Sequence, residues 1–292
     1  MKILLTGANG QVGFELQRSL ACLAEVIATD RNGLDLSSNQ ATQSCIAEHK
    51  PDLIINAAAY TAVDKAESEH DLAMQINAVA PTVMAEEAHK LNIPLIHYST
   101  DYVFNGQNSQ PWLEDDKVEP INVYGETKLL GEQGIASKNA AHLIFRTSWV
   151  YGQRGNNFLL TMKRLGVERE SLSVVDDQIG APTWSRHIAD ATAQIIAQAI
   201  VSGNVTEFFK ANSGIYNLSG GGQTSWHGFT QAIFSQLQLQ GEKVAELNAI
   251  PTSAYPTPAQ RPLYSCLNND KLADTFAISL PNWQQSLTLA MQ

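Results

Sequence analysis

Short apolar segments alternate with longer segments of helical character through the first half of the chain. Five apolar segments have the length of buried strands: residues 2–6, 25–30, 53–56, 95–100 and 143–147. Four segments between or after them have helical composition or spacing: residues 14–20, 40–50, 72–92 and 123–131. Strands that alternate with helices form parallel sheets joined by right-handed crossovers. The pattern therefore predicts an α/β fold of the Rossmann type, with a doubly wound parallel sheet.

The rhythm changes after residue 151. A polar loop is followed by a helix over 158–169, a strand over 172–176, a helix over 185–201 and a short strand over 216–218. Residues 254–262 carry three prolines and cannot form regular structure. We expect a Rossmann domain over residues 1–150, to which a strand and a helix near 172–201 return. Residues 151–171 and 202–292 then form a smaller, irregular part that mainly binds substrate.

Length, composition and charge narrow the class of protein. The chain has 292 residues, 44% of them hydrophobic, so it can bury a sizeable core. It begins directly on an apolar segment of strand length, which predicts no signal peptide, and no stretch reaches the length of a membrane span. Three widely spaced cysteines suggest neither a disulfide framework nor a metal cluster, as expected of a cytoplasmic protein. The formal charge of −10 argues against binding nucleic acid or anionic membrane, and an anionic ligand would need a local basic pocket.

A glycine-rich turn separates the first strand from the first helix. Gly7, Gly10 and Gly13 recur at spacings of three. Glycines allow a tight turn and let the backbone approach a pyrophosphate, which the following helix N-terminus attracts. Asp30 ends the second strand about 20 residues further on, where a carboxylate can accept hydrogen bonds from an adenosine ribose. A glycine-rich turn in some other α/β protein is the alternative, but two strands, a helix and an acid in register favour a dinucleotide site.

Candidate acid–base chemistry follows the fourth strand. Thr100 lies at its carboxyl end, the edge of a parallel sheet where ligands bind. Tyr124 and Lys128 are four residues apart in an expected helix and so share one face. A free phenol is a weak acid–base catalyst at neutral pH, and a neighbouring ammonium would lower its pKa. The alternative is that Tyr124 and Lys128 are an ordinary helical pair without a catalytic role. The dinucleotide-binding unit in the same chain favours a catalytic pair.

These segments resemble the extended short-chain dehydrogenase/reductases at residues 6–13, 56–59, 99–101 and 124–128. Further segments are similar to the dTDP-4-dehydrorhamnose reductase family: residues 62–67, 97–104, 122–128, 145–151, 177–183 and 251–262. The resemblance implies an oxidoreductase that reduces the C4 ketone of dTDP-4-dehydro-L-rhamnose to dTDP-L-rhamnose with NADPH or NADH. Such a product serves surface polysaccharide, including lipopolysaccharide O-antigen.

Two alternatives stay open beside this reaction. One is a regulatory subunit that binds nucleotide without turnover, and the other is a reductase of a different 4-keto nucleotide sugar. The presence of Thr100, Tyr124 and Lys128 favours an enzyme. Related dehydratases place an Asp-Glu pair after the strand-end threonine, whereas this chain has Asp101 and Tyr102, so the second carboxylate that elimination needs is missing.

The resemblance also assigns roles to single residues. Thr100, Tyr124 and Lys128 would be catalytic, with the phenol of Tyr124 as the proton donor. The cofactor would contact Gly7, Gly10, Gln11, Val12, Gly13, Asp30, Arg31, Asp35, Leu36, Ala59, Tyr60, Thr61, Tyr98, Tyr124 and Lys128. The substrate would contact Thr100, Asp101, Tyr102, Trp149 and Arg261.

Three of these assignments carry more detail. Tyr98 would lie behind the nicotinamide, and Arg31 could pair with a 2′-phosphate that Asp30 repels. Arg261, between prolines, would clamp the diphosphate, and its alternative is a salt bridge with a neighbouring acid. Some family members hold Mg²⁺ with carboxylates at a dimer interface. Glu15 could belong to such a site, but its partners cannot be identified, so the metal and a homodimer both stay open.

Overall fold

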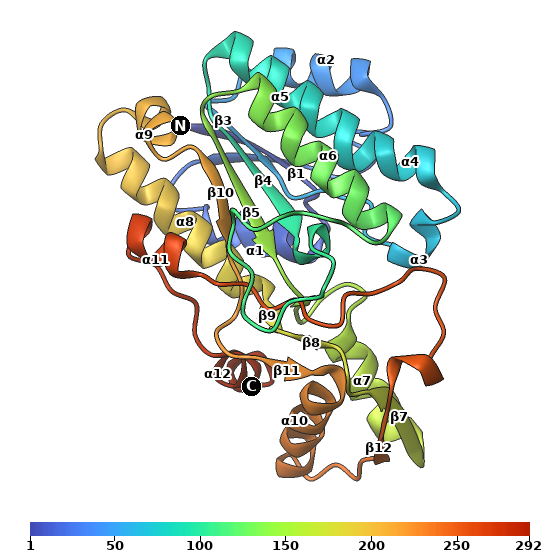
Figure 1. The fold of residues 1–292 in the computed structure, drawn as a ribbon. Coiled ribbons are helices and arrows are strands. Elements are labelled where there is room, and N and C mark those ends of the chain that lie inside the picture. The colour runs from blue at the N-terminus through green and yellow to red at the C-terminus, as the bar shows by residue number, and fades with distance from the viewer.

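The computed structural model describes residues 1–292 and is built around a six-stranded sheet (Figure 1). In spatial order its strands are β10 (Gly214–Asn217), β5 (His142–Thr147), β4 (Leu95–Thr100), β3 (Leu53–Asn56), β1 (Lys2–Thr6) and β2 (Glu25–Thr29). Every neighbouring pair is parallel. Because β2 and β3 lie on opposite sides of β1, the strand order reverses there, and ligands bind outside the carboxyl ends of strands at such a point. The predicted Rossmann-type fold is confirmed.

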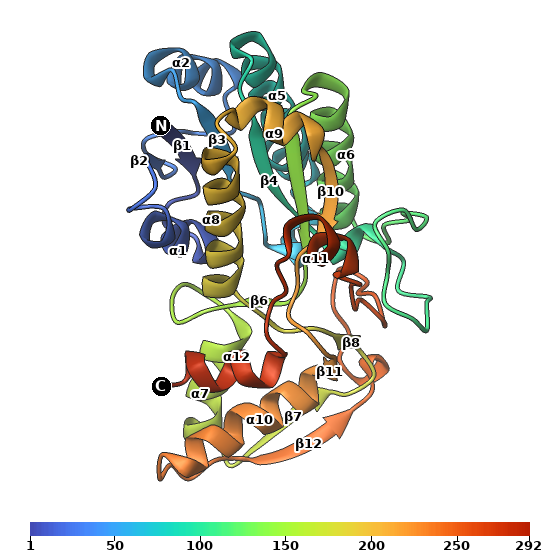
Figure 2. The same cartoon turned by 90° about the vertical axis from the view of Figure 1, so that its left-hand side faces the viewer.

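Helices cover both faces of this sheet (Figure 2). One face is covered by α1 (Gln11–Ser19) and α8 (Ser185–Val201), and the other by α2 (Asn39–His49), α5 (Ala80–Leu91) and α6 (Val123–Lys138). Alternation along β1 explains the two cores: Ile3 and Leu5 join the cluster under α8, while Leu4 joins the one under α5. The helices α3 (Val63–Ala66), α4 (His70–Met74), α9 (Val205–Ala211) and α11 (Asp270–Phe276) are shorter. None of the helices has the length and apolar composition that crossing a membrane requires.

The remaining elements form a smaller part beyond the carboxyl ends of the central strands (Figures 1 and 2). Its three two-stranded sheets pair β6 (Val150–Tyr151) with β9 (Thr183–Trp184), β7 (Ser171–Val175) with β12 (Glu246–Ile250), and β8 (Ile179–Gly180) with β11 (Thr224–Ser225). Around them lie α7 (Phe158–Glu168), α10 (Trp226–Leu239) and α12 (Trp283–Ala290), and these elements share a separate apolar core.

The expected return of a strand near 172–176 to the Rossmann sheet is wrong. This segment forms β7, which pairs with β12 in the smaller part, and only its last two residues are buried. The sixth strand of the central sheet is instead β10, whose four residues pair with β5. The helix over 185–201 does return, as α8 against α1. Period and length alone could not distinguish the two strands, because both are short and half-buried.

A buried ion pair fastens α6 to the sheet. Arg146 of β5 donates from Nε to Glu132 Oε1 at 3.0 Å and from Nη2 to Oε2 at 2.7 Å. The two side chains are only 3% and 2% exposed. Arg146 Nη1 also donates to the carbonyl oxygen of Glu114 at 3.0 Å. A pair with this bidentate geometry satisfies both buried charges, so removing one partner would leave the other uncompensated.

We predict that Arg146→Met destabilises the fold by about 3 to 5 kcal/mol, because Glu132 would stay buried without its partner. Arg164→Met is the matched control, since Arg164 and Glu168 form a pair of equal length, 2.7 Å, with side chains 59% and 52% exposed. Its loss should cost about 0.5 kcal/mol or less. Urea unfolding of both variants measures the difference, and equal losses would contradict the assigned role of the buried pair.

Candidate active site

The glycine turn between β1 and α1 is packed too closely to admit side chains. Gly7 has a φ of +74°, and a Cβ there would lie 2.7 Å from the backbone of Ala57. A Cβ on Gly13 would lie 2.1 Å from the carbonyl oxygen of Gly7. The following helix begins at Gln11 and has no side-chain cap, so the N–H groups of its first turn face outward as an anion site. This geometry fits the pyrophosphate of a dinucleotide.

Asp30 closes the same site from the end of β2. Its Oδ1 accepts hydrogen bonds from the backbone N–H groups of Asn32 and Gly33, at 2.9 and 3.1 Å, and its Oδ2 accepts from Asn9 Nδ2 at 2.9 Å. These hydrogen bonds lower the pKa of the carboxyl. Arg31 follows on the exposed surface. The structure thus brings the carboxylate to the glycine turn, where it can meet a ribose.

A π-helical turn positions the segment after β3. The predicted helix over 72–92 is interrupted at Gln75–Val79, and the side chain of Asn77 from this turn is fully buried. Asn77 Oδ1 accepts from the backbone N–H of Tyr60 at 2.8 Å, and its Nδ2 donates to the carbonyl oxygen of Tyr60 at 3.1 Å. The segment of Ala59, Tyr60 and Thr61 is therefore held in place. Sequence reasoning missed Asn77, because a single inserted residue in a helix leaves no clear periodic signal.

Tyr124 and Thr100 meet at the carboxyl edge of the sheet. Tyr124 lies in the first turn of α6, which Asn122 caps by accepting from the N–H of Gly125 at 2.8 Å. Burial raises the pKa of Tyr124 to about 12, a hydrogen bond with Thr100 opposes this shift, and the charge of Asp101 adds to it. The ring of Tyr102 packs edge-on against Tyr124, with centroids 5.7 Å apart. The phenol is thus a protonated, weak acid held next to a second hydroxyl.

Lys128 lies one turn further along α6 and is 1% exposed. Its Nζ donates to the carbonyl oxygen of Tyr98 at 2.6 Å and lies 3.0 Å from His97 Nε2. Burial lowers the pKa of Lys128 to about 7, and the charge of Glu132 opposes this shift. The expectation that the ammonium lowers the pKa of Tyr124 is therefore not met here, because burial dominates both groups and Nζ points toward β4. His97 was not singled out from the sequence.

The ring of Tyr98 points to the opposite face of the sheet. Its hydroxyl hydrogen-bonds with Thr192 Oγ1 of α8 at 2.8 Å, and its ring packs against Phe145. Its contact with the nicotinamide stays a prediction. Two other residues expected to contact the cofactor follow β2: Asp35 accepts from the backbone N–H and hydroxyl of Ser37, and Leu36 is buried in the core under α2.

Asp101 is a buried carboxylate beside Thr100 and Tyr124. Its Oδ1 accepts from Thr100 Oγ1 at 3.0 Å, and its Oδ2 accepts from Ser148 Oγ at 2.9 Å. Burial raises the pKa of Asp101 to about 6, against these hydrogen bonds and one with Ser265. The carboxylate is thus committed to orienting hydroxyl groups around the site.

Trp149 lies between the central sheet and the smaller part. Its ring stacks on Trp226 of α10, with centroids 3.5 Å apart and planes within 4°. Its φ of 46° is unusual for a bulky side chain. A Cβ on Gly180 would lie 2.4 Å from the indole, so only glycine leaves room for it. The contact of Trp149 with substrate stays a prediction, and the structure pairs its ring with that of Trp226.

Arg261 forms the salt bridge that the sequence left as an alternative. Its Nη2 donates to Asp64 Oδ2 at 2.8 Å, and its Nη1 donates to the carbonyl oxygen of Ala259 at 3.2 Å. Its side chain keeps 22% exposure. The guanidinium also acts on the pKa of Tyr102, which shows that it lies near the Tyr102–Tyr124 pair. The structure therefore brings the cation to the site, and its contact with a diphosphate stays a prediction.

Within one chain, Glu15 lies next to a guanidinium group. Glu15 Oε2 lies 3.4 Å from Arg186 Nη1, and Asp190 Oδ2 accepts from Arg186 Nε at 3.1 Å. Ser19 Oγ donates to the other oxygen of Asp190 at 2.6 Å. A guanidinium thus lies between these two carboxylates of one chain, and a magnesium ion at a dimer interface stays a prediction. The chain has no group of three or more His, Cys, Asp or Glu side chains that could hold a metal ion.

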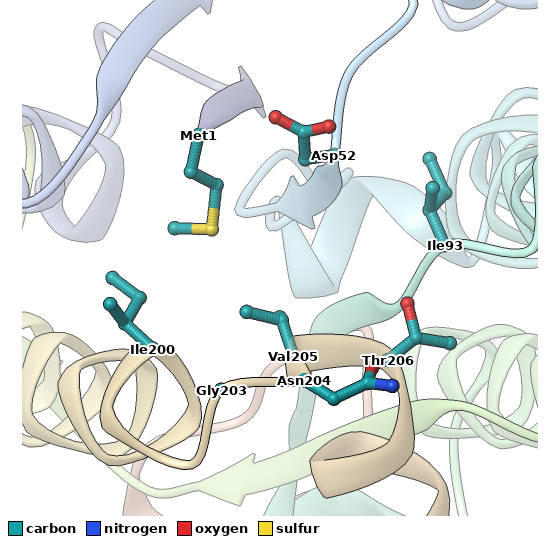
Figure 3. Close-up of a pocket in the computed structure, with 8 residues that line it drawn as sticks. All are labelled: Met1, Asp52, Ile93, Ile200, Gly203, Asn204, Val205 and Thr206. Atoms are coloured by element: carbon teal, nitrogen blue, oxygen red, sulfur yellow. The ribbon is translucent and has the colours of Figure 1, made fainter.

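A surface hollow lies at the opposite end of the sheet from this site (Figure 3). Its lining includes Met1 and Asp52, which precede β1 and β3, together with Ile93 and residues 200 and 203–206. Asp52 accepts a hydrogen bond from the backbone N–H of Lys2, and no cationic side chain lines the hollow. It therefore has neither the glycine-rich turn after β1 nor a cation like Arg261.

Comparison with known proteins identifies a family. The family model described as the RmlD substrate binding domain matches residues 1–292. The chain is 49% identical to dTDP-4-dehydrorhamnose reductase of Shigella flexneri, over 97% of this chain and 95% of that protein. A crystal structure of a dTDP-4-dehydrorhamnose reductase from Clostridium acetobutylicum is similar with a TM-score of 0.91 and 38% identity, covering 100% and 98% of the two chains. A crystal structure of dTDP-4-dehydrorhamnose reductase from Bacillus anthracis in complex with NADP is similar with a TM-score of 0.88 and 35% identity. The match covers 99% of this chain and 98% of that chain.

The buried carboxyl of Asp101 leads to a prediction about pH and stability. Because its pKa is raised from 3.8 to about 6 in the folded protein, this one carboxyl should contribute progressively less to stability as the pH rises from about 4 to about 6. Asp101→Asn removes this titration and keeps an acceptor for Thr100. At pH 8 the variant should be more stable than the wild type by about 1 to 3 kcal/mol, and the difference should vanish near pH 4. Urea unfolding at both pH values measures this, and a difference independent of pH would contradict it.

Proposed function

The chain belongs to the RmlD family of dTDP-4-dehydrorhamnose reductases, and we propose that it reduces the C4 ketone of dTDP-4-dehydro-L-rhamnose to dTDP-L-rhamnose. One observation carries this proposal: Thr100 and Tyr124 lie together at the carboxyl edge of the sheet, the edge that also carries the glycine turn, and Lys128 follows Tyr124 one turn later on α6. A nicotinamide cofactor supplies the hydride in such a reaction. The product serves the synthesis of surface polysaccharide.

Tyr124 supplies the proton in this proposal. A ketone oxygen is a weak base, so a phenol with a pKa of about 12 keeps its proton until hydride addition turns that oxygen into an alkoxide. The phenol then donates its proton to the oxygen on C4, and the resulting phenolate takes a proton back from water. Thr100 fixes the phenol through a hydrogen bond, and it could donate to the same substrate oxygen only by releasing the hydrogen bond that it donates to Asp101. In the structure Lys128 Nζ points toward β4, so its charged form would have to turn toward Tyr124 to stabilise the phenolate.

Reduction accounts for this site better than elimination does. Elimination requires its own acid and base, but Asp101 is enclosed by hydroxyl groups and Tyr102 occupies the position of a second carboxylate. The catalytic residues are all present, which favours an enzyme over a regulatory subunit that binds nucleotide without turnover. A related 4-keto nucleotide sugar stays the alternative substrate.

For the cofactor we propose that both NADPH and NADH are accepted. The glycine turn binds the pyrophosphate, and Asp30 binds an adenosine ribose through the face of its carboxylate that is not engaged with Asn9. Its negative charge repels a 2′-phosphate, whereas the exposed side chain of Arg31 attracts one. The opposed charges at neighbouring positions support acceptance of both cofactors. For the other residues that the resemblance predicts to contact the cofactor, we propose the same contacts as in the family.

The smaller C-terminal part, together with the ends of β4 and β5, would hold the nucleotide sugar. Arg261 is a cation near Tyr102, and a chain of charge −10 needs such a local cation to bind a diphosphate. The aromatic pair of Trp149 and Trp226 supplies a flat apolar surface nearby. The three free cysteines agree with a cytoplasmic location, where thiols stay reduced.

Tyr124→Phe tests the reaction. The variant should fold and bind cofactor, but its kcat should fall by about 10² to 10⁴, because the phenolic proton held next to Thr100 is lost. Absorbance loss of NADPH and of NADH, measured with a panel of 4-keto nucleotide sugars, gives kcat/KM for each cofactor and substrate. Near-normal turnover by the purified variant would refute the assignment of the proton donor.

Arg261→Ala tests the diphosphate contact. The KM for the nucleotide sugar should rise about ten- to a hundredfold, since charge-assisted hydrogen bonds contribute about 1.5 to 3 kcal/mol, and cofactor affinity should stay unchanged. Asp64→Ala is the matched control, because it breaks the same salt bridge but keeps the cation. If both variants leave KM unchanged and lower stability alike, Arg261 serves only the salt bridge.

A further inference from the structure

A buried hydrogen-bonded chain runs under the active site from β1 to α6. Thr6 Oγ1 donates to Asn56 Oδ1 at 2.7 Å, Asn56 Nδ2 lies 3.0 Å from His97 Nδ1, and His97 Nε2 lies 3.0 Å from Lys128 Nζ. The four residues are between 0% and 2% exposed. Only Lys128 has a part in the proposed reaction, so the other three require an explanation.

The orientation of the Asn56 amide is fixed by a backbone group. The N–H of Ala58 lies 3.2 Å from Asn56 Oδ1, and a backbone N–H can only donate. The oxygen of the amide must therefore face Ala58, and its NH₂ group must face His97. The hydroxyl of Thr6 can rotate to fit either orientation of the amide. The N–H of Ala58 therefore determines which orientation Asn56 adopts.

The amide in turn fixes the tautomer of His97. Because Asn56 Nδ2 is a donor, His97 Nδ1 must accept, and a neutral imidazole then carries its hydrogen on Nε2. That N–H points at Lys128 Nζ. An ammonium offers only hydrogens to this contact, whereas an uncharged amine accepts through its lone pair and still donates to the carbonyl oxygen of Tyr98.

We infer that His97 is a positioning residue for the reductase: its Nε2–H holds the resting Lys128 amine uncharged and aimed at the carbonyl of Tyr98. The role in turnover rests on the proposed function. Lys128 must give up this contact to become an ammonium. His97 therefore lowers the pKa of Lys128, and the charged form is lost at a lower pH than it would be without His97.

The other groups around Lys128 do not replace this control. Tyr124 lies one turn before it on α6, and burial keeps this phenol protonated at neutral pH. Glu132 lies one turn after it and favours the charged amine, but its carboxylate is paired with Arg146 of β5. From β4, Tyr98 presents only its carbonyl oxygen to the amine. Burial lowers the pKa of both His97 and Lys128, as expected when neither carries a charge.

Two substitutions give the Lys128 ammonium an acceptor. In Asn56→Asp, the carboxylate accepts from His97 Nδ1, so the hydrogen moves there and Nε2 becomes an acceptor. In His97→Gln, the amide oxygen can take the place of Nε2. In both variants the basic limb of the pH profile of kcat/KM should move to higher pH by about one unit or more, with KM for the nucleotide sugar changed less than about threefold.

Thr6→Val is the matched control. It removes a hydroxyl from the chain but leaves the N–H of Ala58 to orient Asn56, so the basic limb should stay in place. If the limb is unmoved in both folded test variants, or if Thr6→Val moves it as far as they do, the inference is wrong.

A spectroscopic measurement tests the inference without any turnover. In wild-type protein labelled with ¹⁵N-histidine, His97 should show a protonated Nε2 and a bare Nδ1, unchanged from about pH 6 to about pH 9. The histidine signals that are missing from the spectrum of His97→Gln are assigned to His97. The signals that shift in Asn56→Asp give the same assignment independently. A hydrogen on Nδ1, or a charged ring, would overturn the inference. Because this result does not depend on substrate, a failure of the proposed reaction would be distinguishable from a failure of the tautomer.

Discussion

The burial of one lysine amine constrains the whole centre of the molecule. Taking an ammonium-sized group out of water is costly unless polar partners replace the water, and Lys128 is 1% exposed. Its partners all come from β4, through the carbonyl of Tyr98 and the ring of His97. Glu132, on the same helix, is matched by Arg146 of β5. Helix α6 is thereby fixed to two neighbouring strands by polar contacts, in one register and no other.

That register determines where the chemistry can occur. Since residues four apart share a helix face, fixing Lys128 over β4 also fixes Tyr124 one turn nearer the carboxyl end of the strand, beside Thr100. A close approach of backbones supports the same placement, because a Cβ on Gly131 would lie 2.2 Å from the carbonyl oxygen of Asn77. The phenol is thus positioned by contacts that α6 makes with β4 and with the turn that carries Asn77.

The sequence predicted what depends on local periodicity. The central strands, the glycine turn with Asp30, and the shared helix face of Tyr124 and Lys128 could all be predicted from spacing. It could not predict long-range choices between chemically equivalent partners. Whether β7 or β10 joins the central sheet depends on packing between elements far apart in the chain. Likewise, a lysine near a tyrosine predicts an effect of its charge, but the direction of Nζ depends on His97, thirty-one residues away.

The irregular segment of residues 254–262 is a second example of a long-range contact that the sequence could not predict. Its prolines exclude helices and strands, which suggests a loose loop, yet side-chain contacts hold it against the Rossmann part. Asn122 Nδ2, at the cap of α6, donates to the carbonyl oxygen of Gln260 at 2.7 Å, and Asp64 pairs with Arg261. Both contacts fix the loop close to Tyr124. A loop without regular structure therefore has as definite a position here as a strand would have. Because its anchors are the cap of α6 and the segment after β3, rather than the buried lysine, changes in this loop should alter substrate binding and leave the proton donor in place.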